Sequence, residues 1–312
     1  KALDEMVREG ILVRQAGKGT FLNKLNGSSV ESRTVLFLSL RTLSWMRNDV
    51  FYGEVINGLE EELDKADFCL CSFTRAWDQG SLMMPDIIRR HDPAAIVMFA
   101  GGVDIKPQIL ALKTLNVPIL LLNRYFDNFF GAQVYFDDCS GGAMAAEYLL
   151  GKGHRHVGVL AGPPKSPASI DRLRGFREVM TQAGIPISPD MIVAGDWDEM
   201  HGYLSVERIL RRVHRPTAVF CCSDLLAYGA IKRCEKLGLR VPEDVAIIGF
   251  GGFKMSRLHY PSLTTIKMDL PLMGQRVGIW LMDAVHQYQA TGKYEEGYEE
   301  KLPVNLVVGT TA

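Results

Sequence analysis

The sequence predicts a two-lobed α/β protein in which each lobe is a parallel β-sheet flanked by helices. The chain has 312 residues, more than the roughly 100–200 residues usual for one domain. From residue 34 onward, short apolar segments of strand length alternate with longer amphipathic segments. Such alternation is typical of parallel strands joined by crossover helices. It falls into two successive series, so we expect two sheets and two lobes.

The first 23 residues differ from the rest of the chain. They begin with KALDEMVREG, which has apolar residues at helical spacing and a final glycine that ends the helix. Two short strand-like segments then surround a turn in ILVRQAGKGTFL, which predicts a β-hairpin. We therefore expect residues 1–23 to hold the end of a recognition helix and the wing of a winged helix. Residues 24–33 are polar and lack an apolar period, which predicts a linker.

The two series of strands and helices occupy residues 34–312. The first series contains the strand-like segments TVLFLSL, FCLCSF, AAIVMFA and PILLLN. The second contains QVYFDD, HVGVLAG, AVFCCSD and VAIIGFG, with amphipathic segments between them. We expect lobe 1 to comprise about residues 34–137 and 270–291, and lobe 2 about residues 138–269 and 292–312.

The composition is that of an ordinary globular chain, with 47% hydrophobic and 23% charged residues. No apolar segment approaches the ~20 residues needed to span a bilayer, and the charged start of the chain does not resemble a secretory leader. We therefore expect no membrane partner. The net charge of −1 argues against a nucleic-acid surface over the whole chain, so contact with DNA must be local.

Six cysteines lie mostly within apolar segments such as FCLCSF and AVFCCSD. They lack the CxxC spacing of a zinc site or a redox motif. Cys221 and Cys222 are adjacent on a predicted strand and would point to opposite faces. We therefore expect buried free thiols, no metal site, no cofactor and a reducing, cytoplasmic compartment.

Polar and aromatic side chains follow several predicted strands at their carboxyl ends. Ligands of open parallel sheets bind beyond these ends. Aromatic, amide, guanidinium and hydroxyl groups can stack on a sugar ring and hydrogen-bond its hydroxyls, so the pattern suits a neutral polyol. The residues expected to contact this small polar ligand are Asp49, Phe51, Tyr52, Asn123, Arg172, Trp197, Ser223 and Asp224.

Several of these positions have a structural alternative. Asp224 stands equally well as the N-cap of the helix that follows it. Trp197 can be a half-buried core tryptophan, and Phe51 and Tyr52 can belong to the core of lobe 1. His154, in KGHRH, follows a helix-ending glycine and precedes a strand, so we interpret it as a turn residue and not a catalyst.

Four motifs carry a family resemblance. They are GHRHVGVLAG, RLRGF, SDLLAYGAIKRCEKLGLRVPEDVAIIGF and YPSLTTIKMDLPLMGQ. In order and spacing they resemble the effector-binding module of LacI/GalR-type repressors, over about residues 34–312. The start of the chain, KALDEMVREGILVRQAGKGTFL, separately resembles the C-terminal part of a GntR-type winged helix-turn-helix. This combination is similar to the architecture of the arabinose repressor.

The resemblance implies a type I periplasmic-binding-protein-like fold and assigns roles to several residues. Asn123 would bind a hydroxyl, Arg172 would supply the arginine of the site, and Trp197 would stack on the ligand. Ser223 stands where an amide is common, and Leu270 and Met273 would form apolar walls. Sugar-binding members carry an aspartate pair where this chain has Gly251 and Gly252. Asp49 and Val50 likewise replace an Asn-Pro pair, and Asp49 is a candidate to compensate for the lost acceptors.

The N-terminal resemblance implies contact with operator DNA. Arg14 and Lys18 of the wing would contact phosphates or the minor groove, and Gly17 and Gly19 would allow the tight turn. A solvated hairpin charge is the alternative for Lys18. The family dimerises through its two lobes, so the resemblance also implies a homodimer. Ligand-driven closure of the lobes would then change the separation of two DNA readers.

Two other classes of function remain to be weighed. A periplasmic-type solute-binding protein for a sugar would share the two-lobed fold but would not have the winged-helix remnant. An enzyme is the other alternative, but the sequence has no nucleophile elbow, phosphate loop, HExxH motif or paired carboxylates. We therefore expect a ligand-responsive transcription regulator, most simply a repressor, without catalytic residues.

Overall fold

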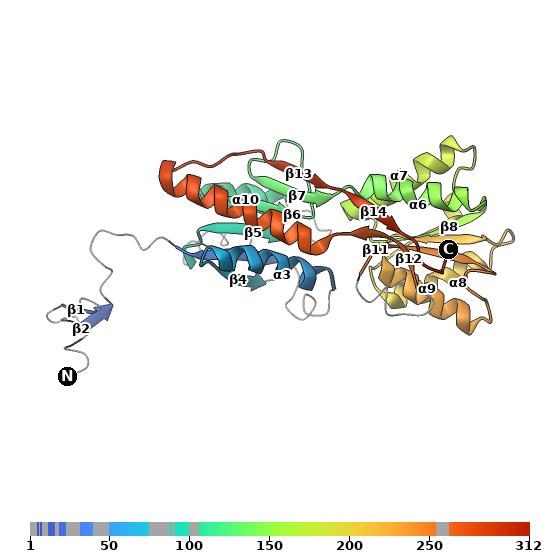
Figure 1. Ribbon diagram of the computed structural model, residues 1–312, viewed down its shortest axis with the longest axis horizontal. Coiled ribbons are helices and arrows are strands. Elements are labelled where there is room, and N and C mark those ends of the chain that lie inside the picture. The colour runs from blue at the N-terminus through green and yellow to red at the C-terminus, as the bar shows by residue number, and fades with distance from the viewer. Residues whose placement is uncertain are drawn as a thin grey trace.

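Two lobes lie side by side in the computed structural model, and a separate hairpin precedes them (Figure 1). The structure describes residues 5, 7, 12–15, 19–22, 32–39, 50–74, 88, 91–99, 106–253 and 262–312. The hairpin consists of β1 (Leu12–Gln15) and β2 (Gly19–Leu22), which pair antiparallel from Leu12 opposite Leu22 to Gln15 opposite Gly19. The predicted hairpin is confirmed. Its turn and most of the predicted linker lie outside the described residues.

Lobe 1 contains a six-stranded sheet in the order β13-β7-β6-β5-β3-β4, in which all neighbouring strands are parallel. Its strands are β3 (Thr34–Ser39), β4 (Cys69–Thr74), β5 (Ala95–Phe99), β6 (Ile119–Leu122), β7 (Ala132–Phe136) and β13 (Glu299–Leu302). Its helices are α3 (Val50–Lys65), α5 (Lys106–Leu112), the 3-10 turn η2 (Lys113–Leu115) and α10 (Leu270–Thr291). Helices α3 and α10 pack side by side on one face of the sheet (Figure 1).

Lobe 2 contains a second six-stranded sheet in the order β14-β12-β11-β10-β8-β9. All pairs are parallel except β12 with β14, which is antiparallel. Its strands are β8 (Val157–Ala161), β9 (Ile192–Ala194), β10 (Ala218–Cys221), β11 (Ala246–Gly251), β12 (Thr264–Met268) and β14 (Val304–Val307). Its helices are α6 (Asp138–Gly151), α7 (Pro167–Gln182), the 3-10 turn η3 (Pro189–Met191), α8 (Glu199–Leu210) and α9 (Asp224–Lys236).

The central strands of each sheet are buried on both faces, which explains why they have nearly continuous apolar sequences. In β10, Phe220 packs with α6 and α7 on one face, whereas Val219 and Cys221 pack with α8 and α9 on the other. Cys222 lies on the face of Phe220. Cys221 and Cys222 thus point to opposite faces, as the period of two along a strand predicts.

The chain passes between the lobes three times, each time through a single residue between two elements. These residues are Asp137, Asp269 and Pro303. Asp137 and Asp269 are also N-caps, because their side chains accept hydrogen bonds from the backbone of Ser140 and Leu272 at 3.1 and 3.3 Å. Two of the three connections therefore end directly in a capped helix, which limits their freedom.

The third crossing differs from the division predicted from the sequence. Strand β13 pairs with β7 in lobe 1, and the backbone N–H of Asp137 donates to the Leu302 carbonyl at 2.9 Å. We expected residues 292–312 in lobe 2, but the chain crosses into lobe 2 only at Pro303. The β13 sequence EEKL is short and charged, so its pattern does not indicate which sheet it joins. Its partner lies more than 160 residues away in sequence.

Helices α6 and α7 approach closely through one glycine on each. A Cβ at Gly142 would overlap the carbonyl oxygen of Arg172, and a Cβ at Gly175 would overlap the carbonyl oxygen of Cys139. The obstacle is backbone in both cases and cannot move aside as a flexible side chain would. These glycines set the spacing between the two helices, and reciprocal glycines recur in the pairs α3–α10 and α8–α9.

Replacing Gly175 with alanine should therefore destabilise the protein by about 1–3 kcal/mol, the usual cost of overpacking. Urea unfolding measures this as a lower midpoint with an unchanged slope. Gly151→Ala at the end of α6 is the matched control, since its Cβ would meet nothing within 4 Å. This control should leave stability unchanged or raise it by about 0.5–1 kcal/mol. Equal stability of the two variants would contradict the close-approach argument.

Candidate functional site

The carboxyl ends of both sheets face the junction between the lobes. Strand β7 ends at Phe136, one residue before the crossing into lobe 2, and β12 ends at Met268, one residue before the crossing back. Both crossings thus start at carboxyl ends of parallel strands, the edge at which open α/β sheets bind ligands. We describe as the candidate site the residues that follow these strand ends.

Arg172 holds three elements of lobe 2 together at this junction. From α7, its Nε donates to Asp138 Oδ1 at 2.7 Å and its Nη1 donates to the Cys222 carbonyl at 2.7 Å. Its Nη2 faces the sulfur of Met268 at 3.5 Å, which is a weak acceptor. The Arg172 side chain therefore joins the start of α6, the end of β10 and the end of β12.

The Arg172–Asp138 ion pair is almost completely removed from water. The two side chains are 6% and 8% exposed. Burial raises the pKa of the Asp138 carboxyl, and the adjacent Arg172 guanidinium partly offsets that rise. Arg172 also stacks on aromatic rings, with its guanidinium carbon 3.8 Å from the centroid of Phe250 and 5.5 Å from that of Trp197. A guanidinium between aromatic faces gains cation–π stabilisation.

Trp197 is half-buried beside Arg172. Its indole lies against Gly162, at the end of β8, where a Cβ would overlap the ring. The next residue, Asp198, caps α8 by accepting from the backbone of His201 at 2.7 Å. Contact with Gly162 and the capped helix that begins directly after Trp197 together fix the position of its ring.

Ser223 and Asp224 both have structural partners. Ser223 is the N-cap of α9 and accepts from the Leu225 N–H at 3.2 Å. Asp224 is fully buried, and its carboxylate accepts from the Phe253 N–H at 3.1 Å and the Thr265 hydroxyl at 2.6 Å. The cap predicted at Asp224 therefore falls one residue earlier, and Asp224 instead joins the segments that follow β10 and β11 to the start of β12.

The turn after β11 has a backbone conformation that favours glycine at two successive positions. Gly251 and Gly252 have φ angles of 137° and 67°, a region that L-residues rarely adopt. The Phe253 ring lies against Gly251, within about 3 Å of where a Cβ would stand. The turn thus places the Phe253 ring beside the end of β11, and the Phe253 backbone N–H donates to Asp224.

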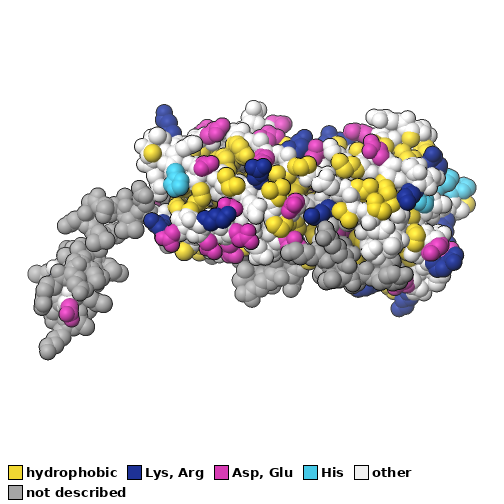
Figure 2. Space-filling model, viewed as in Figure 1, with side chains coloured by type: hydrophobic (Ala, Val, Ile, Leu, Met, Phe, Trp, Pro, Cys, Tyr) yellow, Lys and Arg dark blue, Asp and Glu magenta, His cyan; other side chains and the backbone are white. Residues whose placement is uncertain are grey.

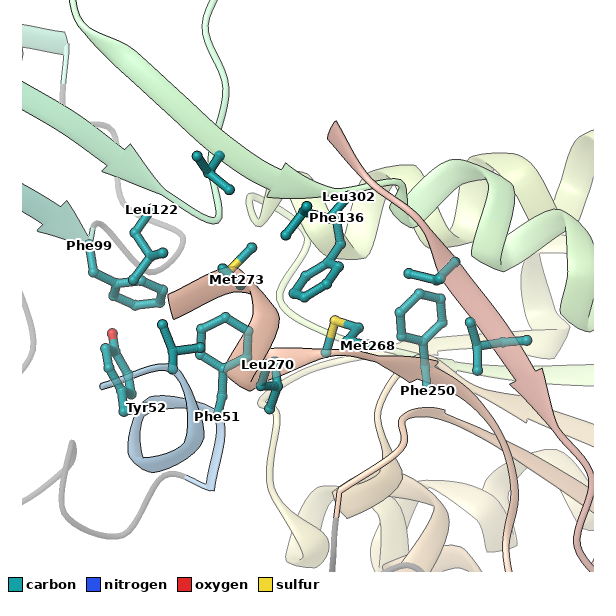
Figure 3. Close-up of a cluster of buried hydrophobic side chains, with 14 of the residues drawn as sticks. Phe51, Tyr52, Phe99, Leu122, Phe136, Phe250, Met268, Leu270, Met273 and Leu302 are labelled. Carbon is teal, nitrogen blue, oxygen red and sulfur yellow. The ribbon is translucent and has the colours of Figure 1, made fainter. Parts of the chain in front are cut away.

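Lobe 1 contributes a mostly apolar wall to the junction. Phe51, Tyr52 and Phe99 form an aromatic cluster in which the Tyr52 and Phe99 centroids are 4.4 Å apart. Leu270 and Met273 are buried beside it. Figure 3 shows that these side chains continue through Phe136 and Met268 to Phe250, so one apolar core runs from lobe 1 into lobe 2. The burial of Phe51 and Tyr52 agrees with a place in the core of lobe 1.

Asn123 is the polar residue on the lobe 1 side. It directly follows β6, is half-buried, and adopts a φ of 54°, which asparagine tolerates better than most residues. Its backbone N–H donates to the Val134 carbonyl at 2.8 Å. Among the described site residues of lobe 1, Asn123 is thus the one that places a polar side chain directly after a strand.

Asp49, a predicted ligand residue, and Lys18, a predicted DNA contact, lie outside the described residues. Arg14, the other predicted DNA contact, is an exposed residue of β1. Conversely, Asp138 and Phe250, two partners of Arg172, were not expected from the sequence. The QVYFDD segment could have indicated Asp138, because it places two acidic residues before a helix and only one, Asp137, can cap that helix.

The cysteines depart in part from the expectation of buried thiols. Cys221, Cys222 and Cys234 are buried, but Cys69 and Cys71 on edge strand β4 are exposed. Over the described residues there is no group of three or more His, Cys, Asp or Glu side chains that could hold a metal ion. Within the same residues no helix is long and apolar enough to span a membrane. His154 lies in the turn before β8, with Nδ1 2.9 Å from the Thr217 hydroxyl.

Two parallel-sheet lobes joined by three crossings define a periplasmic-binding-protein-like binding module. A model of the periplasmic binding protein-like domain family matches residues 146–312. The chain is 30% identical over 239 residues to the HTH-type transcriptional repressor PurR of Pasteurella multocida, covering 76% of this chain and 71% of that protein. It is 39% identical over 167 residues to PurR of Klebsiella pneumoniae, covering 54% of this chain and 48% of that relative.

The fold agrees with solved structures. The transcriptional regulator CelR in complex with cellobiose superposes with a TM-score of 0.80 at 24% identity, covering 91% of this chain and 86% of that one. The chain therefore belongs to the LacI/PurR family of ligand-responsive transcription regulators, whose effector domain has the periplasmic-binding-protein-like fold.

Removing Asp138 should show how much the junction depends on its ion pair. Asp138→Ala leaves the Arg172 cation buried without its carboxylate and should cost about 3–5 kcal/mol of unfolding free energy. Glu199→Ala is the control, because it removes a carboxylate from an exposed ion pair with Lys232. The Lys232 side chain is 53% exposed and that of Glu199 is 46% exposed. That change should cost less than about 1 kcal/mol. Urea unfolding compares the two, and similar losses would contradict a special role for Asp138.

Proposed function

We propose that this chain senses a small polar ligand between its two lobes and couples lobe closure to DNA binding. The observation that carries the proposal is the pair Arg172 and Trp197, a guanidinium and an indole held in fixed positions where both sheets end. The Arg172 Nη2 faces a thioether, which accepts hydrogen bonds weakly, so this nitrogen can still donate strongly to a ligand oxygen. A ligand that touches both lobes stabilises the arrangement in which it touches both.

For the ligand class we propose a carbohydrate or a sugar derivative. The half-buried Trp197 ring offers an apolar face to a sugar ring, and Asn123 offers both a donor and an acceptor for its hydroxyls. The structurally similar regulator CelR was solved with cellobiose, which supports this class. Because Asp138 and Asp224 are bound within lobe 2, we assign Asp49 as the carboxylate that accepts from ring hydroxyls.

For the DNA-binding part we propose a GntR-like winged helix, in the arrangement of the arabinose repressor. The antiparallel pair β1–β2 supports this, because it has the size and place of a wing. Arg14 and Lys18 contact the DNA backbone or minor groove in this proposal. Cationic and anionic side chains are interspersed on the face of both lobes that Figure 2 shows. In this proposal the basic contacts with DNA come from the wing and its helix.

We also propose a cytoplasmic homodimer that acts as a repressor. Met200 and Leu204 support the dimer, because they are one turn apart on α8 and 63% and 59% exposed. Side chains one turn apart on a helix lie on the same face, so these two form a small exposed apolar patch for the proposed contact. A dimer gives lobe closure its effect on DNA, since closure moves two wings relative to each other.

A thermal-shift screen of monosaccharides, disaccharides and sugar phosphates tests the ligand. A ligand at 100 times its Kd should stabilise the protein by about 2.7 kcal/mol and raise its Tm. Asn123→Gly removes the amide but keeps a residue that tolerates the positive φ, and should weaken binding about tenfold. Asn128→Gly is the matched control, because Asn128 is exposed and has a φ of 55°. No shift with any sugar, or equal losses in the two variants, would contradict the proposal.

Arg14→Ala tests the wing in a protein that carries the complete winged helix. Loss of one phosphate contact should weaken binding to all DNA sequences alike and reduce the slope of log K against log salt by about 1. Fluorescence anisotropy with a labelled duplex over a range of salt concentrations measures both. An unchanged salt slope would remove Arg14 from the DNA interface.

A further inference from the structure

Lobe 1 and lobe 2 are also joined by a hydrogen bond away from the three crossings. Tyr125, in the loop between β6 and β7, donates its hydroxyl to Asp171 Oδ2 on α7 at 2.9 Å. The other oxygen of Asp171 accepts from Arg174 at 2.8 Å. A tyrosine of one lobe is thus bound to a carboxylate of the other, and Asp171 is only 8% exposed.

The tyrosine is held firmly within lobe 1. Its ring packs on Tyr135 with centroids 4.8 Å apart. The next residue, Phe126, donates its backbone N–H to the buried Gln133 side chain at 2.9 Å, and the same side chain donates back to the Phe126 carbonyl at 3.3 Å. Since Gln133 lies on β7, the loop that carries Tyr125 is fastened to the sheet of lobe 1.

The carboxylate is held equally firmly within lobe 2. Asp171 lies in the second turn of α7, directly before Arg172, whose guanidinium binds Asp138 and the Cys222 carbonyl. Burial and the hydrogen bond to Asp171 raise the pKa of Tyr125 to about 12. The hydroxyl therefore stays protonated at neutral pH and remains a donor.

We propose that Tyr125 and Asp171 form an interlobe latch that favours the lobe arrangement seen here. Each partner is rigidly placed in its own lobe, so the bond can persist only while the lobes keep this relative position. The latch also links the two segments that carry the candidate ligand residues. Asn123 stands two residues before Tyr125, and Arg172 stands one residue after Asp171. Its consequence for ligand affinity rests on the function proposed above, but its effect on the lobes does not.

Tyr125→Phe removes the hydroxyl and keeps the ring that packs on Tyr135. A hydrogen bond to a charged group shifts an equilibrium about tenfold or more, so this variant should populate a second, separated lobe arrangement. Tyr298→Phe is the matched control, because Tyr298 also donates to a carboxylate, Glu300, at 2.8 Å but within lobe 1. The control should leave the lobe arrangement unchanged.

Double electron–electron resonance measures the arrangement without any ligand. Spin labels go on exposed positions of the two lobes, Glu61→Cys on α3 and Glu235→Cys on α9. The background protein, diluted with unlabelled chain, has serine at the three cysteines that are not buried, Cys69, Cys71 and Cys139. We expect the interlobe distance distribution to broaden or shift in Tyr125→Phe and to match the reference in Tyr298→Phe. An unchanged distribution in Tyr125→Phe, or the same change in both variants, overturns the latch.

Urea unfolding and ligand titration distinguish a latch from a tyrosine that only stabilises the fold. If Tyr125 only stabilised the fold, Tyr125→Phe would lower the free energy of unfolding, as Tyr298→Phe would, and the interlobe distances would not change. Once a ligand is identified, Tyr125→Phe should weaken its binding about tenfold, and undiminished binding would overturn the statement that the latched arrangement is the ligand-binding one. If the distances change but the sugar screen yields nothing, the latch stands and the proposed carbohydrate function fails.

Discussion

The three single-residue crossings at Asp137, Asp269 and Pro303 are the constraint on which the rest of the structure depends. Because all three start at the carboxyl ends of parallel strands, they bring together at one junction the edges at which open α/β sheets bind ligands. They also carry the apolar core from one lobe into the other, through Phe136, Met268 and Leu302. The connections are short and two of them end in capped helices, which restricts the relative orientations open to the lobes.

Buried polar groups then determine how this junction is built. Removing a charged group from water is costly unless it has partners, and two buried carboxylates of lobe 2 have such partners. Asp138 is bound by Arg172, and Asp224 is bound by Phe253 and Thr265. These carboxylates stabilise the scaffold of the proposed site. Among the described residues, the groups proposed to face a ligand are the Trp197 indole, the Asn123 amide and part of the Arg172 guanidinium.

The glycine turn after β11 shows how backbone geometry can change binding chemistry. Where Gly251 and Gly252 adopt positive φ angles, an aspartate would be strained, and the turn instead directs Phe253 toward the strand end. The same loop is fastened by the buried Asp224 carboxylate. The glycine turn and the placement of the Phe253 ring are therefore linked, and they make this part of lobe 2 apolar.

Alternating apolar segments and helix-capping residues determined the fold class, the strands, the hairpin and the strand ends at which the site lies, because these features are local and have a fixed period. Arg172 and Trp197 were predicted near the strand ends from this alternation and from the resemblance to LacI/GalR-type motifs. Only the tertiary structure decided that β13 joins lobe 1, that Asp138 binds Arg172, that Asp224 is buried and that Tyr125 reaches Asp171. Each of these depends on which distant segments meet, and the burial and pairing of a charge depend on the whole surrounding fold rather than on its neighbours in sequence.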